Sequence, residues 1–261
     1  MLTNVGAARK ADIAYSAGAI IFLLLVWVIG WRTNLINAAY FPTPETLAGA
    51  FAELVKNGYQ GHPLAQHIGI SLFRTLVGFA IGVLIGIPVG LLAGYDRRAG
   101  AIITPIMAFI RPIPPIAFIP MSVLYFGLGE VGKIVLITFV SFNYVEANAQ
   151  AGAANIPIMY LRAAESLGLS RLQTFFRVIM PGALPQIFTG LKVALALSWA
   201  VVVAAELVGA QTGLGFMISD AAQLFRIPIV YIGIILIGLI GLAMNIALST
   251  LENRTIHWKG R

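Results

Sequence analysis

A few polar side chains lie inside otherwise apolar segments, and these are the residues that could carry chemistry in this chain. Asn143 and Glu146 lie three residues apart, Lys192 and Trp199 lie seven apart, and Arg111 opens the proline-rich run RPIPPIAFIP. A charged side chain at membrane depth is costly, so it faces other helices or a water-filled path. These five residues predict either a polar translocation path or a set of interhelical hydrogen bonds and ion pairs, and both interpretations stay open.

A second polar group forms the segment YLRAAESLGLSRLQTFFRVIMP, from Tyr160 to Pro181, between two hydrophobic runs. Ser170 is followed three residues later by Gln173, the capping-box spacing that begins a helix, and Gly168 is suited to end the preceding helix. We therefore predict two short helices that meet at residues 168–170, with Pro181 closing the second. Such a hairpin either contacts a partner outside the lipid or lies on the membrane surface.

Motifs for enzyme chemistry are weak in this sequence. The GxGxxG match at residues 127–132 follows a predicted membrane span instead of a strand, so it predicts a turn and not a dinucleotide site. No HExxH or GxxxxGK[ST] motif occurs, the three histidines are scattered, and there is no cysteine for a thiolate metal site. The sequence predicts no catalytic residue, no metal site and no cofactor held by this chain.

The elements that must position these residues are membrane-spanning helices. Of the 261 residues, 59% are hydrophobic and 10% are charged, whereas soluble domains carry about 25% charged residues. Apolar runs of spanning length predict an all-α polytopic membrane protein with a single transmembrane domain over residues 1–261. The six predicted spans are Ile13–Trp31, Gln66–Tyr95, Ala101–Ile119, Val131–Gln150, Leu184–Val208 and Ile227–Leu248.

Basic residues orient these spans. The net charge of +7 comes from Lys and Arg at span ends, which the positive-inside rule explains better than a nucleic-acid partner. With the N-terminus inside, the outer side receives Arg32, Lys56, Arg226 and Lys133, and the cytoplasmic side receives Arg9, Lys10, Arg97, Arg98, Arg162, Arg171, Arg177, Arg254, Lys259 and Arg261. This asymmetry predicts that both termini and the hairpin, at about residues 155–181, lie in the cytoplasm.

Residues 41–57 predict a short surface helix on the outer side. Thr43 is a natural N-cap and Pro44 fits the first helical position. The apolar face predicted by helical spacing consists of Leu47, Phe51, Leu54 and Val55. This helix is expected either to brace the bundle or to contact an external partner.

The second span carries a row of glycines at four-residue spacing. These residues are Gly78, Gly82, Gly86, Gly90 and Gly94. A ridge without side chains lets another helix approach closely, so the row predicts tight helix packing. Arg74, near the outer end of the same span, is expected to have a structural role.

The hairpin resembles the EAA loop of ABC importer permeases, whose pattern is E-A-A, three residues, G, nine residues and I-x-L-P. Ala163 and Ala164 match the two alanines, Gly168 matches the glycine, and residues 178–181 stand in for I-x-L-P. The departure from the pattern is Arg162, which occupies the acidic position.

Other segments narrow the resemblance to the taurine, nitrate and sulfonate branch, closest to taurine permeases. They are RPIPPIAFIPMSVLYFGLGEVGKI, MPGALPQIFTGLKVALALSWAVVVAAELVGAQTGLGFM and the tail TIHWKG. The resemblance implies a type I importer fold, a permease homodimer, two separate ATPase subunits that bind ATP and Mg, and a periplasmic or lipid-anchored binding protein. It also implies ATPase contact through the hairpin residues Arg162, Ala163, Ala164, Glu165, Gly168, Ser170, Arg171 and Pro181.

Together these features predict the permease subunit of an ATP-driven importer in the bacterial inner membrane. Its expected cargo is taurine or a related small sulfonate anion, moved by alternating access. Nitrate, bicarbonate or a pyrimidine precursor are alternative cargoes for the same machinery. A stand-alone secondary transporter or channel is the alternative of another class, and inverted repeats with paired broken helices would favour it.

Overall fold

A computed structural model describes residues 40–257 and, closer to the N-terminus, residues 15, 17–19, 21–22, 25–30 and 32–33. The described residues form helices and connecting loops, without a strand. The predicted span Ile13–Trp31 lies largely outside them. The helices that follow are α2 (Pro44–Asn57), α3 (Leu64–Tyr95), α4 (Arg97–Ile110), η1 (Pro115–Phe118), α5 (Ile119–Phe126), α6 (Glu130–Ala154), α7 (Ile158–Ser166), α8 (Arg171–Thr174), η2 (Phe175–Ile179), α9 (Met180–Gly209), α10 (Leu214–Gln223) and α11 (Ile227–Thr255).

Three of the described helices are long and apolar enough to cross a membrane: α3, α11 and the continuous helix Arg171–Gly209 that ends with α9. The bent pair of α4 with η1 and α5 would make a fourth span. Helix α6 has 25 residues, or roughly 37 Å at 1.5 Å per residue, but it carries more polar residues. It contacts α3, α9, α5 and η1, so its polar side chains face protein.

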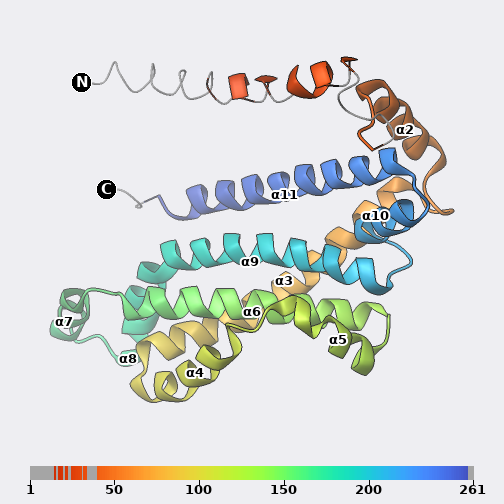
Figure 1. Ribbon diagram of the computed structural model, residues 1–261. Helices are drawn as coiled ribbons and strands as arrows, with labels where there is room; N and C mark the ends of the chain where they lie inside the picture. The colour runs from red at the N-terminus through yellow and green to blue at the C-terminus, as the bar shows by residue number, and fades with distance from the viewer. Residues whose placement is uncertain are drawn as a thin grey trace.

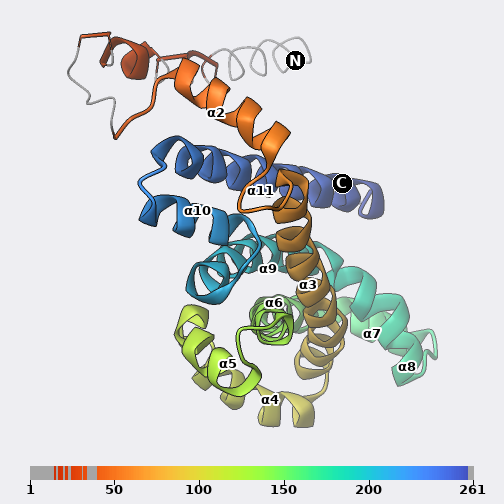
Figure 2. The same ribbon diagram turned by 90° about the vertical axis from the view of Figure 1, so that its right-hand side faces the viewer.

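The helices are arranged around α6, which lies near the centre of the bundle and is seen end-on in Figure 2. Helix α3 crosses it on one side and α9 lies beside it, with α11 beyond α9 (Figure 1). Helices α4 and α5 cover the side of α6 away from α11. The core follows this arrangement, with one apolar cluster between α3, α6 and α9 and another between α9, α10 and α11.

The glycine ridge of α3 packs against α6, as predicted. A Cβ added at Gly82 would lie 2.5 Å from Ser141 Cβ, and one added at Gly90 would lie 2.3 Å from the carbonyl oxygen of Glu146. A Cβ atom does not approach another carbon atom or a carbonyl oxygen so closely without a shift of the backbone. The two backbones therefore meet at this spacing only because α3 presents glycine along the contact.

The predicted third span, Ala101–Ile119, is wrong as a single helix. Helix α4 ends at Ile110, and the following helical segment, Pro115–Phe126, is bent by 84° relative to it. Pro112, Pro114 and Pro115 cause the break, because proline lacks an N–H and disfavours a helical conformation in the preceding residue. The other predicted spans within residues 40–257 lie inside α3, α6, α9 and α11.

Helix α2 confirms that this segment is helical but corrects its buried face. The Thr43 Oγ1 atom accepts a hydrogen bond from the Thr46 N–H at 3.1 Å and caps the helix. Leu54 is buried, whereas Phe51 and Val55 are exposed. Because α2 packs mainly on the single helix α11, only a narrow stripe is covered, and that stripe consists of Leu47, Ala50 and Leu54.

Candidate functional site

The predicted hairpin is formed, and its first helix ends in a Schellman motif. The Leu169 N–H donates to the carbonyl oxygen of Ala164 at 3.0 Å, and the Gly168 N–H donates to that of Glu165 at 2.9 Å. Gly168 adopts φ +71°, a conformation that favours glycine because other residues carry a Cβ. The junction therefore depends on Gly168 for its backbone conformation, and the space around it is open, with no atom within 4 Å of an added Cβ.

The second helix of the hairpin begins in a capping box, as predicted. The Ser170 Oγ atom accepts from the Gln173 N–H at 3.3 Å, and the Gln173 Oε1 atom accepts from the Ser170 N–H at 2.9 Å. The predicted closure at Pro181 is wrong, because the helix continues through the π-helical turn η2 into α9. Pro181 directly follows η2 at the start of α9, so its missing N–H falls at the change from π-helical to α-helical hydrogen bonding.

The hairpin forms one end of the described bundle, with α7 and α8 beyond the ends of α3 and α6 (Figure 1). Its outer surface is apolar at Leu167 and Leu172, whose side chains are 80% and 69% exposed. Among the predicted contact residues, Ala164 is only 3% exposed and packs inside the hairpin, so we reassign it to hairpin packing. Pro181 is half-buried, and the exposed ones are Arg162, Ala163, Glu165, Gly168, Ser170 and Arg171.

The structure divides the five predicted path residues into two groups, and the first lies between the break after α4 and helix α6. The Arg111 Nη2 atom donates to Glu146 Oε2 at 2.7 Å and to Gln150 Oε1 at 3.1 Å. Glu146 is fully buried, and the Arg111 side chain is 35% exposed. Arg111 and Asn143 line a cavity of about 110 Å³ beside this ion pair.

The second group lies on the far side of α9, against α11. The Lys192 Nζ atom donates to Glu252 Oε2 at 2.5 Å, and the Trp199 Nε1 atom donates to the carbonyl oxygen of Ile237 at 3.0 Å. Lys192 and Trp199 line a cavity of about 140 Å³ together with Gly241, Met244 and other residues. The interhelical polar contacts of the second interpretation are present in both groups, and the translocation path stays a prediction.

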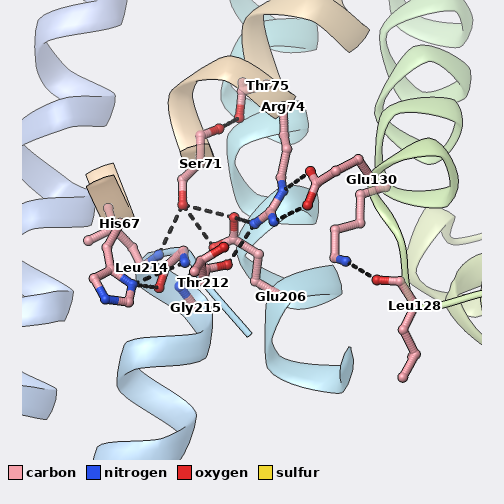
Figure 3. A network of polar contacts seen from close by, with 12 residues as sticks. His67, Ser71, Arg74, Thr75, Leu128, Glu130, Glu206, Thr212, Leu214 and Gly215 are labelled. Atoms are coloured by element: carbon pink, nitrogen blue, oxygen red, sulfur yellow. Dashed lines mark hydrogen bonds and ion pairs between the residues drawn. The ribbon is translucent and has the colours of Figure 1, made fainter. Parts of the chain in front are cut away.

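An ion-pair network that the sequence did not predict joins α3, α6 and α9 at the other end of the bundle from the hairpin (Figure 3). The Arg74 Nη1 atom donates to Glu206 Oε1 at 2.6 Å, and its Nη2 atom donates to Glu130 Oε1 at 2.5 Å. Arg74 and Glu206 are buried, whereas the Glu130 side chain is 46% exposed. This pairing confirms the structural role expected for Arg74.

The loop before α10 closes the same network through hydrogen bonds to α3 and α9. The Ser71 hydroxyl donates to Glu206, and the Gly215 N–H donates to Glu206 Oε2 at 2.9 Å. The Gly213 N–H donates to His67 Nδ1 at 3.1 Å, and this nitrogen also lies 3.2 Å from the Gly213 carbonyl oxygen. The His67 Nε2 atom lies 3.2 Å from the Tyr59 carbonyl oxygen. Each of these groups is paired, which makes the network a structural clamp.

The sequence contained a signal for this network. His67, Ser71 and Arg74 lie at i, i+4 and i+7 in the second span, which places three polar side chains on one helix face. Their partners could not be named from spacing, because Glu206 lies 132 residues from Arg74.

A further group of polar contacts connects the loop after α2 with α10. The Tyr59 hydroxyl donates to Asp220 Oδ2 at 2.7 Å, and Gln60 Nε2 donates to the same oxygen at 2.9 Å. These hydrogen bonds hold the pKa of Asp220 below its usual value, and the one from Tyr59 has the largest effect. Burial and the neighbouring carboxylate raise the pKa of Tyr59, so its hydroxyl remains a donor at neutral pH.

Comparison with known proteins assigns the family. Residues 86–257 match the family described as binding-protein-dependent transport system inner membrane component. The chain belongs to this family. It is 37% identical to the taurine transport system permease protein TauC of Escherichia coli (strain K12), over 95% of this chain and 91% of TauC. It is 32% identical to the putative aliphatic sulfonates transport permease protein SsuC of Bacillus subtilis (strain 168), over 98% of this chain and 94% of SsuC.

A third relative and a solved structure agree with this assignment. The nitrate import permease protein NrtB of Synechocystis sp. (strain ATCC 27184 / PCC 6803 / Kazusa) is 32% identical, over 92% of this chain and 88% of NrtB. The fold is similar to that of a chain of the inward-facing MetNI methionine ABC transporter, with a TM-score of 0.66, 22% identity and coverage of 74% of this chain and 95% of that chain. This protein is therefore the permease component of an ABC importer with a type I fold.

Proposed function

We propose that this permease moves taurine or a related small sulfonate into the cell. The observation that carries the proposal is the 37% identity to a taurine permease over 95% of the chain. The similarity to a putative aliphatic sulfonate permease supports the same class of cargo. Nitrate is the second candidate, because a nitrate permease is 32% identical over 92% of the chain.

In this proposal the hairpin transmits the energy of ATP to the membrane helices. Two copies of the permease pair with two ATP-binding subunits, which hold ATP and Mg, while this chain contributes no catalytic group. The hairpin suits the coupling role because it presents exposed apolar and basic side chains on a junction fixed by two caps. Leu167 and Leu172 fill apolar hollows of the ATPase, and Arg162 and Arg171 contact acidic groups around them.

The proposed orientation places the hairpin in the cytoplasm. The hairpin and the end of α11 lie at the same end of the described bundle (Figure 1), and Arg162, Arg171, Arg177 and Arg254 are basic residues of these segments. The positive-inside rule assigns such an end to the cytoplasm. The other end, with α2 and α10, then faces a periplasmic or lipid-anchored substrate-binding protein, and both termini are cytoplasmic.

The translocation path in this proposal uses the cavity beside Arg111, Asn143 and Glu146. Lys192 and Trp199 lie on the other side of α9, so a single path in one subunit cannot be lined by both groups at once. The first group is favoured because it adjoins the break between α4 and α5. Irregular backbone at membrane depth occurs where it lines a cavity or is covered by protein.

Uptake in cells that lack their own sulfonate importers tests the proposal. The permease is expressed with its ATPase and binding protein, and accumulation of labelled taurine and labelled nitrate is measured. Taurine accumulation that disappears when the ATPase cannot hydrolyse ATP is the expected result. Nitrate accumulation without taurine accumulation would assign the second cargo, and uptake by the purified permease alone would instead indicate a secondary transporter.

A further inference from the structure

Two buried hydrogen-bond acceptors on α6 have no donor, and one of them belongs to Asn143, which lines the cavity beside this helix. Among the described residues, Asn143 Oδ1 and Glu146 Oε1 are the buried side-chain atoms without a hydrogen-bond partner. Asn143 is 7% exposed and lines the cavity with Arg111 and Tyr144, while Glu146 is fully buried behind Arg111. An unpaired buried polar atom is costly, so Asn143 Oδ1 indicates a ligand that brings a donor into the cavity.

The chemical identity of the Asn143 acceptor follows from its own hydrogen bond. The amide nitrogen of Asn143 donates to the carbonyl oxygen of Phe139 at 3.0 Å. A carbonyl oxygen accepts only donors, so the amide cannot be turned around, and the oxygen is the free atom. Asn143 lies near the middle of α6, which places this acceptor deep in the bundle.

Arg111 supplies the opposite chemistry at the same cavity. Arg111 makes two hydrogen bonds among the described residues, to Glu146 and Gln150, and both use the Nη2 atom. The Nε and Nη1 atoms therefore remain available as donors. Arg111 is therefore able to bind an oxyanion while it stays paired with Glu146.

The ion pair also makes the cavity neutral overall. Arg111 contributes one positive charge and Glu146 contributes one negative charge, and their atoms are 2.7 Å apart. A simple anion gains little here, because the negative charge of Glu146 repels it and Asn143 Oδ1 stays unpaired. A ligand with separate positive and negative ends satisfies both sides.

We propose that this cavity is a subsite for a small zwitterion that carries an ammonium group and an oxyanion, such as an aminosulfonate. The oxyanion binds the free donors of Arg111, and the ammonium donates to Asn143 Oδ1 and is attracted by the negative charge of Glu146, which is paired with Arg111. The cavity of about 110 Å³ exceeds the space that a single water needs, so it has room for a small organic ligand. The inference rests on the proposed sulfonate transport and adds that the permease itself selects for the amino group.

Equilibrium binding to the permease–ATPase complex, without the binding protein, tests this subsite. Labelled taurine is competed with 3-aminopropanesulfonate, which keeps the ammonium, and with ethanesulfonate, which replaces it by hydrogen. The aminosulfonate is expected to compete at a concentration at least about tenfold lower, as expected for hydrogen bonds to a charged group. Equal competition by the two compounds, or the absence of saturable taurine binding at tens of millimolar, would overturn the inference.

Two variants separate recognition of the ligand from loss of structure. Asn143→Leu is expected to weaken taurine binding about tenfold and to leave ethanesulfonate binding unchanged. Glu146→Gln is expected to weaken taurine binding and to strengthen ethanesulfonate binding, because the negative charge that attracts the ammonium and repels a simple anion is then removed. A misfolded complex loses both ligands, so opposite changes cannot come from misfolding. Equal losses of both ligands in correctly assembled complexes would refute the assignment.

Asn148→Leu is the matched control on the same helix. Asn148 also donates to the carbonyl oxygen four residues earlier, but its Oδ1 atom already accepts from Gln186. Its replacement is expected to leave the preference for aminosulfonates unchanged, and a lost preference would contradict the role given to Asn143. If the assembled transporter takes up sulfonates when ATP is supplied, but the two competitors displace taurine equally, the subsite alone is refuted. If no sulfonate is taken up at all, the proposed function is refuted.

Discussion

Replacement of Gly168 is expected to uncouple ATP hydrolysis from transport. Gly168 has φ +71°, and an added Cβ there would have no atom within 4 Å. The cost of Gly168→Ala is therefore backbone strain alone, about 1–2 kcal/mol for an L-residue in the left-handed region. This corresponds to a roughly 5- to 30-fold shift of the conformational equilibrium away from the capped junction. Asn tolerates this conformation better, so Gly168→Asn should retain more of the coupling.

The assay is ATP hydrolysis by the assembled transporter, measured with and without the loaded binding protein. We expect stimulation by the binding protein to fall up to about tenfold in Gly168→Ala, with Gly168→Asn between this variant and the wild type. The basal hydrolysis of the ATPase subunits should change little, because their nucleotide sites lie in other chains.

Gly61 provides a matched control at the other end of the bundle. It has φ +79° and also has open space around an added Cβ, so Gly61→Ala should carry a similar strain without touching the hairpin. Full stimulation in Gly168→Ala would refute the role of the junction. An equal loss of stimulation in Gly61→Ala would attribute the effect to general destabilisation.

Three further predictions concern stability, measured by thermal unfolding of the purified permease. Glu206→Gln should cost about 2 kcal/mol, because Arg74 then lacks its buried carboxylate partner, and unchanged stability would refute the clamp. Gly82→Ala should cost about 1–3 kcal/mol by overpacking against α6, whereas Gly69→Ala, in open space on the same helix, should cost nothing, and equal effects would contradict the packing argument. The pKa of Asp220 is lowered in the folded state mainly because a tyrosine hydroxyl donates to it, so its stabilisation is full above the unfolded pKa of about 3.9 and is lost as the pH falls through the lower folded value. The stability difference between the wild type and Asp220→Asn should therefore shrink from pH ~7 to pH ~2, and a constant difference would refute the linkage.

Local features of the fold were predicted correctly because residues close in the sequence determine them. The caps at Gly168 and Ser170 use partners within a few residues, and both are present. The GxGxxG match is a turn, in which Gly127 ends α5 with φ +70° and Gly129 precedes α6. The glycine row of α3 predicted a tight helix contact, since four-residue spacing alone puts those positions on one face.

Errors in the prediction arose where a local signal was read without its neighbours. Pro181 was expected to close the hairpin, but the helix passes through it because the preceding π-helical turn leads directly into α9. Val55 was expected on the buried face of α2, yet it is exposed because α2 meets one helix along a narrow stripe. Both outcomes depend on how neighbouring turns and helices are placed.

The sequence by itself determined the membrane class, the capped hairpin and the polar residues available for a path. Only the tertiary structure decided which polar residues meet. It paired Arg74 with Glu130 and Glu206, 56 and 132 residues away, and it separated Arg111 and Asn143 from Lys192 and Trp199. The physical reason is that helical spacing gives the face on which a side chain lies. The rotation and crossing of packed helices then decide what that face contacts.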